Sequence, residues 1–275
     1  MKNGKRSLII WLMLSPLLLV ILFPFAVMFL TAVKPRSEVF SYPPRWLPTS
    51  FRWENFVDMW YAANFGSALW NSLVISIGAT ILVLIVSVPA AYAIARFTFA
   101  FKQPFSQFLL ATQMLSPIVL VLGLFHLVVF CGLIDSKYAL ILIYAAFNIA
   151  FAVWMLRSYF GSIPVELEEA ALIDGCSRLA AIIRIFVPLA LPAMVVTAIF
   201  TFINSWNEFV VALTLLRSQD NFTLPLRVFS LVGGRYTVEW EQVMAATLLA
   251  TLPVAILFSW LQRYLMGGLT MGAIK

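Results

Sequence analysis

Six apolar stretches, each long enough to cross a bilayer as a helix, constrain this chain more than any other feature. A helix needs about 20 apolar residues to cross a hydrocarbon core of roughly 30 Å. Hydrophobic residues make up 63% of the sequence and charged residues 11%, whereas soluble domains are nearer half apolar and a quarter charged. We therefore predict an all-α, polytopic membrane protein. The predicted spans are Leu8 to Val33, Asn71 to Ala95, Phe105 to Leu133, Tyr138 to Leu156, Pro188 to Leu215 and Gln242 to Met266.

The first stretch resembles a secretory signal only in its basic start, Lys2, Lys5 and Arg6. Its apolar run is about twice the usual length of such a signal, and residues 31–35 form a poor cleavage site. We expect a retained first helix.

The distribution of Lys and Arg favours both termini on the cytoplasmic side. In this orientation the inner segments contain slightly more of these cations than the outer ones. The outer loops are then residues 34–70 and 217–241. The first contains Pro43 to Pro48, which predicts an extended loop with an aromatic anchor rather than a folded domain.

A polar segment at residues 162–188 interrupts the apolar pattern on the predicted cytoplasmic side. Ser162 and Pro164 suit the start of a helix. Gly175 suits the left-handed turn that ends it, and Ser177 can cap a second helix running to Arg184. The segment therefore predicts a hairpin of two short helices.

Charge and small side chains alternate in the first of these helices. Three glutamates, at 166, 168 and 169, fall near the positive end of the helix dipole. Leu167, Ala170 and Ala171 share one face, whose small residues would let a partner approach closely. An interfacial hairpin resting on lipid headgroups is the alternative, but such helices favour Lys and Arg over Glu.

Catalytic and metal-binding patterns are absent from the sequence. No Gly-x-x-x-x-Gly-Lys-Ser/Thr run is present to cradle phosphates, so the chain is not expected to hydrolyse ATP. His126 is the sole histidine and is expected to pack or to hydrogen-bond between helices. Cys131 and Cys176 fall on opposite sides of the predicted membrane and are expected to stay free.

Polar residues within the spans are candidates for a transport path. Thr197, Thr201, Asn204 and Glu208 recur at steps of four, three and four, which predicts one helical face. A carboxylate within a span should face protein or water, because exposure to lipid is costly. Alternatively, these groups hydrogen-bond neighbouring helices. The full candidate set is Gln113, Ser116, Asn148, Thr201, Asn204, Asn207 and Glu208. Pro117 and Gly123 can open the third helix locally.

The segment from Glu169 to Pro188 resembles the signature loop of ABC importer permeases. Its pattern is Glu-Ala-Ala, three residues, Gly, nine residues and Ile-x-Leu-Pro, with Val187 in place of Leu. The sequence is closest to sugar-importer permeases of the maltose-transporter type. The other similar stretches are Pro43 to Pro48, Asn71 to Leu73, Pro89 to Ala93, Trp206 to Phe209 and the tail Gly268 to Ala273, where Met271 departs from the family.

The resemblance implies a type I ABC importer permease fold, with one transmembrane domain over residues 1–275 and a cytoplasmic coupling helix. It implies uptake of a sugar, polyol or glycoside across a bacterial inner membrane. An ion-coupled secondary transporter is the alternative. Implied ATPase-coupling residues are Glu169, Ala170, Ala171, Asp174, Gly175, Ile185 and Pro188, with a second contact at Gly268 to Lys275.

The implied partners are a second homologous permease, a dimer of ATPase subunits, an extracytoplasmic solute-binding protein and membrane lipid. Nucleic acid is not among them, since the basic pI of about 9.5 fits cationic membrane flanks. The chain itself is expected to bind no cofactor, and ATP and magnesium belong to the ATPases.

Overall fold

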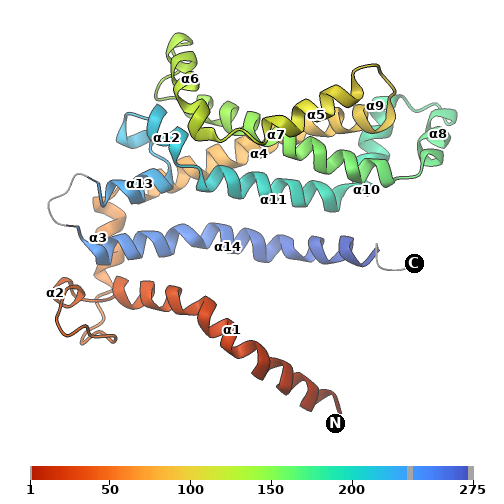
Figure 1. Ribbon diagram of the computed structural model, residues 1–275. Helices are drawn as coiled ribbons and strands as arrows, with labels where there is room; N and C mark the ends of the chain where they lie inside the picture. The colour runs from red at the N-terminus through yellow and green to blue at the C-terminus, as the bar shows by residue number, and fades with distance from the viewer. Residues whose placement is uncertain (1, 234–237, 272–275) are drawn as a thin grey trace. The chain divides into compact units, whose positions relative to one another are not determined.

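A computed structural model shows a chain that is helical, without strands, over the residues that it describes (Figure 1). It describes the backbone of residues 2–233 and 238–271 and the side chains of residues 11–233 and 238–262. Four helices are long and apolar enough to cross a membrane, and six crossings result if each of two bent helix pairs forms one span. By length and composition, this agrees with the six predicted spans.

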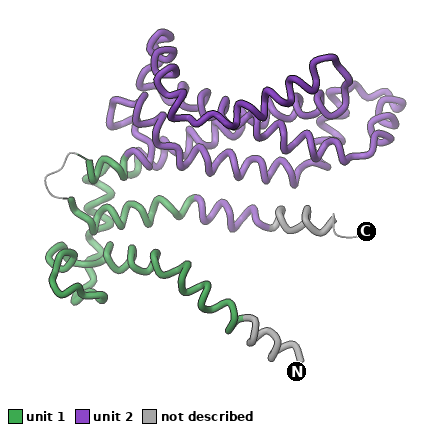
Figure 2. The backbone as a smooth tube through the Cα atoms, viewed as in Figure 1, with its two compact units in different colours: residues 1–66, 227–253 green, residues 67–226, 254–275 purple. Residues whose placement is uncertain are grey.

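The chain forms two compact units, residues 1–66 with 227–253 and residues 67–226 with 254–275 (Figure 2). The single permease domain over residues 1–275 stays a prediction. In chain order the elements are α1 (Lys2–Ala32), α2 (Arg36–Val39), α3 (Glu54–Ala62), α4 (Phe65–Arg96), α5 (Lys102–Thr112), α6 (Pro117–Phe130), α7 (Lys137–Ser162), α8 (Val165–Ile173), α9 (Arg178–Ala181), the π-helix η1 (Ile182–Phe186), α10 (Val187–Leu189), α11 (Leu191–Asn207), α12 (Val210–Leu215), the 3-10 helix η2 (Gln219–Asn221), α13 (Leu224–Ser230) and α14 (Trp240–Met271).

In the first unit, the segment after α1 is tied back to the end of that helix. The buried amide of Asn55 donates to the carbonyls of Ala32 at 2.8 Å and of Lys34 at 2.9 Å. These bonds satisfy acceptors that a helix end leaves free. The predicted extended loop at 34–70 therefore needs a correction, because it contains α2, α3 and the start of α4.

The second unit is built around α4, α7 and the α11–α12 segment, whose buried side chains meet in separate clusters. Ile75 of α4 clusters with Leu140 of α7 and Leu215 of α12. Farther along both helices, Tyr92 of α4 clusters with Phe160 of α7, together with Phe186. The first cluster contains earlier residues of both α4 and α7, and the second contains later residues of both, so these two helices run parallel. The order is reversed in α11–α12, which therefore runs opposite to them. This alternation is what successive membrane crossings require.

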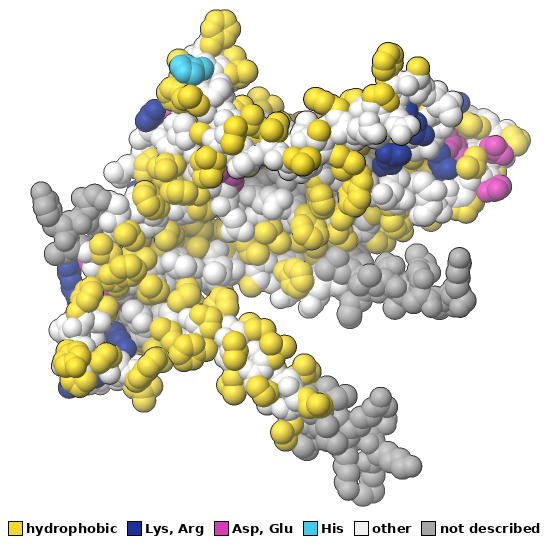
Figure 3. Space-filling view, in the orientation of Figure 1, with side chains coloured by type: hydrophobic (Ala, Val, Ile, Leu, Met, Phe, Trp, Pro, Cys, Tyr) yellow, Lys and Arg dark blue, Asp and Glu magenta, His cyan; other side chains and the backbone are white. Residues whose placement is uncertain are grey.

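Small residues let these helices approach one another. Ala79, Ala139, Ala145, Ala152 and Ala212 are each no more than 2% exposed. Between membrane helices, close van der Waals packing of small side chains replaces the hydrophobic effect as a source of association. Large apolar side chains are also exposed, many of them on the face that Figure 3 shows, and they suit lipid or a partner helix.

Two of the predicted spans are broken helices. A local opening was predicted for the third span, whereas no break was predicted in the fifth. Between α5 and α6 the chain bends by 97°, just before Pro117. Ser116 is extended there, with φ −69° and ψ 136°, since a residue that precedes proline is disfavoured in a helix. The second bent pair joins residues 178–189 to α11 at an angle of 79°. The span predicted at Pro188 to Leu215 is interrupted again after α11, where Glu208 is extended, with φ −68° and ψ 128°. Gly123 lies within α6 and opens nothing.

His126 and the cysteines were predicted to have no special role. Both cysteines are free, as expected. His126 is exposed on α6, which the bend turns away from α5, so its expected packing within the chain is wrong. Its ring makes a T-shaped contact with the ring of neighbouring Phe125, at a centroid distance of 6.0 Å.

At the end of the unit opposite to α8, Asp135 joins the loop before α7 to the loop after α12. Its Oδ1 accepts hydrogen bonds from the backbone N–H of Arg217 at 2.8 Å and of Ser218 at 3.0 Å, and its Oδ2 accepts one from the Ser218 hydroxyl. Partial burial raises the pKa of Asp135, but these hydrogen bonds outweigh it and hold the pKa below its ordinary value.

We expect Asp135→Asn to lower the free energy of unfolding by about 1 kcal/mol at neutral pH, because charge-assisted hydrogen bonds are lost. A lowered pKa means that this stabilisation is present above the ordinary aspartate pKa of about 4 and is lost as the pH falls through the lower folded value. Thermal unfolding of the detergent-purified chain at several pH values measures the difference. Asp58→Asn is the control, since Asp58 and Arg52 are exposed and 3.8 Å apart. An equal loss in both variants would contradict the prediction.

Candidate functional site

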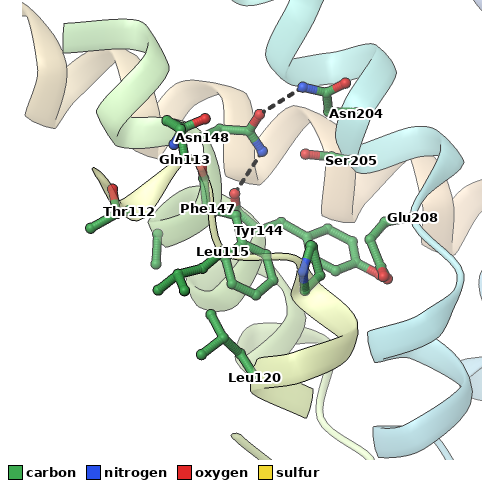
Figure 4. A pocket seen from close by; sticks show the side chains of 12 residues that line it. Thr112, Gln113, Leu115, Leu120, Tyr144, Phe147, Asn148, Asn204, Ser205 and Glu208 are labelled. Carbon is green, nitrogen blue, oxygen red and sulfur yellow. Dashed lines mark hydrogen bonds between the residues drawn. The ribbon is translucent and has the colours of Figure 1, made fainter. Parts of the chain in front are cut away.

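A pocket of about 340 Å³ opens beside the middle of α7, where the break before Pro117 and the break at Glu208 meet (Figure 4). Its walls come from the end of α5, the start of α6, one face of α7 and the end of α11. The lining residues are Thr112, Gln113, Leu115, Pro117, Leu120, Tyr144, Ala146, Phe147, Asn148, Asn204, Ser205 and Glu208. The pocket therefore combines apolar walls with hydrogen-bonding groups.

Glu208 is the one charged residue in this lining, and its carboxylate caps α12. Glu208 Oε1 accepts from the backbone N–H of Val211 at 2.9 Å, and Oε2 accepts from that of Ala212 at 3.3 Å. The Tyr144 hydroxyl donates to the same Oε2 at 2.6 Å. The first turn of a helix leaves N–H groups free, and no water is present in lipid to satisfy them. The carboxylate thus replaces water at the break.

Amide side chains form the opposite edge of the pocket. Asn204 donates to Oδ1 of Asn148 at 3.1 Å, and Asn148 donates to the Tyr144 carbonyl at 2.8 Å (Figure 4). Gln113 donates to the Phe147 carbonyl at 3.1 Å. Each of these side-chain amides also has donor or acceptor sites that these hydrogen bonds do not use. The arrangement can offer both donors and acceptors to a polar ligand.

The structure brings together four of the seven predicted pathway residues: Gln113, Asn148, Asn204 and Glu208. Ser116, Thr201 and Asn207 do not line this pocket, and their assignment to the pathway stays a prediction.

The predicted continuous stripe on one helical face is wrong, since α11 ends at Asn207 and Glu208 lies beyond it. Thr197 is fully buried, and its hydroxyl donates to the Ala193 carbonyl at 2.8 Å.

Tyr144 and Ser205 were missed by sequence reasoning. Tyr144 lies four residues before Asn148, so both fall on one face of α7, and that spacing was a usable signal. Ser205 follows Asn204 directly and is 4% exposed. Its position in the pocket depends on how α11 packs, which spacing alone does not give.

The predicted hairpin at residues 162–188 is present, with a well-formed turn after α8. Gly175 has φ +82°, and its N–H donates to the Leu172 carbonyl at 3.1 Å. The N–H of Cys176 donates to the Ala171 carbonyl at 2.9 Å, which completes a Schellman motif. The Ser177 hydroxyl caps α9 by accepting from Ala180 N–H at 3.2 Å, as predicted.

The start of the hairpin differs from the prediction. Ser162 is the last residue of α7 and donates to the Tyr159 carbonyl at 2.7 Å, so it does not cap α8. The second helix is also not uniform, because α9 passes into the π-helix η1 at Ile182.

The hairpin residues divide into exposed and inward-facing sets. Glu169, Ala170, Asp174 and Gly175 are exposed, and acidic side chains gather over α8 in Figure 3. Ala171 is 7% exposed, so the expectation that it shares an exposed face with Leu167 and Ala170 is wrong. It lies three residues after buried Glu168, on the face of α8 that packs inward. Farther on, Ile185 is half-buried and Pro188 is exposed.

Among the described residues, no group of three or more His, Cys, Asp or Glu could hold a metal ion. The expected tail contact at Gly268 to Lys275 lies outside the residues whose side chains the structure describes. Neither the pocket nor the hairpin contains a paired acid and base around a reactive group.

Comparison with known proteins identifies this arrangement. Residues 87–270 match the family described as "Binding-protein-dependent transport system inner membrane component". The chain belongs to this family. It is therefore a multi-pass inner membrane component of a transport system, and the match covers both the pocket and the hairpin. The predicted permease family is confirmed.

Individual relatives cover nearly the whole permease. It is 35% identical over 264 residues to the inner membrane ABC transporter permease protein YcjP of Escherichia coli, covering 95% of this chain and 94% of the relative. It is 34% identical over 277 residues to the diacetylchitobiose uptake system permease protein DasC of Streptomyces coelicolor, covering 98% and 99%. These relatives confirm a transport subunit rather than an enzyme.

A solved structure supports the predicted fold. A chain from a bacterial ABC transporter involved in the import of the acidic polysaccharide alginate aligns with a TM-score of 0.79 and 22% identity, covering 96% of this permease and 97% of that chain. The type I ABC importer permease fold is thereby confirmed.

We expect Glu208→Ala to destabilise the permease by about 1 to 2 kcal/mol, since two N–H groups of α12 lose their acceptor. Asn204→Ala, in the same pocket, removes one hydrogen bond at 3.1 Å and should cost about 0.6 kcal/mol or less. Thermal unfolding of the detergent-purified permease compares the two variants. Equal losses would argue against a capping role for Glu208.

Proposed function

We propose that this permease is the transmembrane subunit of an ATP-driven ABC importer that takes up a sugar, polyol or sugar glycoside by alternating access. Family membership supports the transport role. The name of the Streptomyces relative, a diacetylchitobiose uptake permease, supports a carbohydrate cargo. ATP hydrolysis would stabilise one of two states of the complex and so move the pocket from outer to inner access.

The pocket at the two helix breaks is the observation that carries this proposal. A sugar presents many hydroxyls, which amide and carboxylate side chains can bind as both donors and acceptors. Asn148, Asn204, Gln113 and Glu208 supply such groups beside the apolar wall of Phe147. We propose these four as pathway residues. Ser116 and Asn207, which are exposed, and Thr201, which is buried, are further candidates outside this pocket.

Orientation follows from charge and from the packing of the second unit. Arg96, Arg157, Arg178 and Arg184 lie at the end of the unit that bears α8, and the positive-inside rule places that end in the cytoplasm. We therefore propose that the hairpin and both termini are cytoplasmic. The Asp135 end then faces outward, where an extracytoplasmic solute-binding protein would dock.

We propose that the hairpin is a coupling helix seated on a partner ATPase. Its exposed residues Glu169, Ala170, Asp174 and Gly175 would make this contact, together with Ile185 and Pro188 nearby. Three large apolar side chains of the hairpin are also exposed: Ile173 at 85%, Leu179 at 66% and Ile183 at 59%. Exposed apolar side chains next to charge, at a membrane end that should meet water, mark a protein interface.

We propose the remaining partners from the apolar surfaces that this chain leaves uncovered. Apolar side chains of α6 beside the pocket are exposed, with Ile118 at 64%, Val119 at 72% and Leu122 at 68%. A second homologous permease would cover them and close the pathway, while lipid would surround the rest. The ATPase dimer would hold ATP and magnesium, so that this chain binds no cofactor of its own.

Reconstitution tests the function. The permease, its partner permease, the ATPases and the binding protein encoded beside it would be placed in proteoliposomes. Uptake of a panel that includes diacetylchitobiose, other oligosaccharides and polyols is then measured. We expect one or more sugars to accumulate only with ATP. Uptake driven by an ion gradient without the ATPases would contradict the proposal and favour a secondary transporter.

Two glycines test the coupling turn. A Cβ added at Gly175 or at Gly161 would meet no other group within 4 Å. Of these two glycines, only Gly175, at φ +82°, has a left-handed backbone. Alanine there costs about 1 to 2 kcal/mol, so Gly175→Ala should lower ATPase retention on the purified permease about five- to thirtyfold at limiting ATPase. Gly161→Ala, within α7, should leave retention unchanged. Equal retention by both variants would speak against docking at this turn.

A further inference from the structure

We propose that Tyr92, Arg96 and Glu168 form a joint through which movement of the coupling hairpin is passed to α4. These three residues, called the α4 joint below, act as positioning residues. The proposal rests on the proposed ATP-driven function and adds to it the side chains that connect α8 to a membrane helix.

Glu168 is the centre of the α4 joint. Its Oε2 lies 3.3 Å from Arg96 Nε, and its Oε1 accepts a hydrogen bond from the Tyr92 hydroxyl. The side chains of Arg96 and Glu168 are each 8% exposed. Tyr92 and Arg96 lie one helical turn apart at the end of α4, so both hold one carboxylate of α8.

Arg96 also connects α4 to the segments on either side of α8. Its guanidinium donates to the carbonyl of Ile163, two residues before α8, at 2.7 Å. It also lies over the ring of Phe186, at the end of η1, 5.0 Å from the centroid. The Tyr92 ring meets the same Phe186 edge-on at 5.0 Å. Both ends of the hairpin and its central helix are thus fastened to one turn of α4.

The other acidic residues of α8 have no such anchor. Glu166 and Glu169 are exposed, and neither takes part in an ion pair in the described part of the chain. An ion pair between exposed long side chains is weak and is easily broken, whereas breaking a buried ion pair leaves a buried charge without a partner. A displacement of α8 therefore moves α4 with it instead of stretching the α4 joint.

Movement of α4 can reach the pocket through packed side chains. Val83, in the middle of α4, packs in one cluster with Ala145 and Ala152 of α7. Ala145 lies between Tyr144 and Ala146, which both line the pocket. Because these small side chains are buried, α7 cannot stay in place when α4 shifts without opening a void.

The test measures whether ATP still changes access to the pocket when the α4 joint is altered. Ala146→Cys places a reporter in the pocket without removing a hydrogen-bonding side chain, in a background with Cys131→Ser and Cys176→Ser. The complex with partner permease and ATPases is labelled in nanodiscs with a membrane-impermeant maleimide, with or without ATP and orthovanadate. No transported substrate is required.

With the α4 joint intact, we expect ATP and orthovanadate to change the labelling rate about fivefold or more. Glu168→Gln should reduce this change to less than about twofold while ATP hydrolysis continues. Tyr92→Phe, which keeps the ring packing, should give an intermediate change. The exposed neighbour supplies the matched control, since Glu166→Gln should keep the full change. A general folding defect would lower hydrolysis and labelling together.

Parental responses in both Glu168→Gln and Tyr92→Phe would overturn the proposal. If Glu168→Gln does not assemble, Tyr92→Phe decides alone, and a full response there also overturns it. No response to ATP in the parent, or no binding of ATPases, would instead contradict the proposed function. Failure of the α4 joint and failure of the importer assignment therefore give different results.

Discussion

A helix that breaks inside an apolar span exposes backbone N–H and C=O groups where no water can bind them, and the pocket is organised around this constraint. The break after α11 is tolerated because the Glu208 carboxylate accepts two N–H groups of α12. Tyr144 then holds that carboxylate from α7. The groups that satisfy the backbone are also the groups that face the pocket, so the break and the polar site arise together.

The buried charged groups at the hairpin end of the unit also have their partners within the protein. Arg96 and Glu168 are buried, and each is held by several neighbours, among them Tyr92, Ile163 and the Phe186 ring. A buried pair of this kind contributes little net stability compared with apolar packing, but it fixes geometry because breaking it is costly. Glu169 is exposed on the same helix and remains available for a partner. Position on α8 therefore distinguishes the glutamate that anchors this helix to α4 from the one that is exposed to a partner.

Sequence reasoning predicted what depends on local rules. The Gly175 turn, the Ser177 cap, the apolar spans and four pocket residues follow from spacing and residue type. The break before Pro117 was anticipated only as a local opening, because proline restricts its predecessor without giving a bend of 97°. The inward turn of Ala171 and Glu168 was missed, since the apolar and acidic residues of α8 occupy both faces. Which face packs depends on Arg96, which is distant in sequence.

The two sites are connected by the order in which the helices pack. Because α4 and α7 run parallel and share a cluster at each end, the turn of α4 that meets the hairpin and the turn of α7 that lines the pocket belong to one layer. The pocket walls opposite α7 come from the helices that are broken. The packed pair of α4 and α7 thus faces two broken segments. In the proposed movement, a shift of this pair would change the pocket by bending at breaks that already exist. Continuous helices would have to unwind within the membrane to give the same movement, leaving backbone groups without partners.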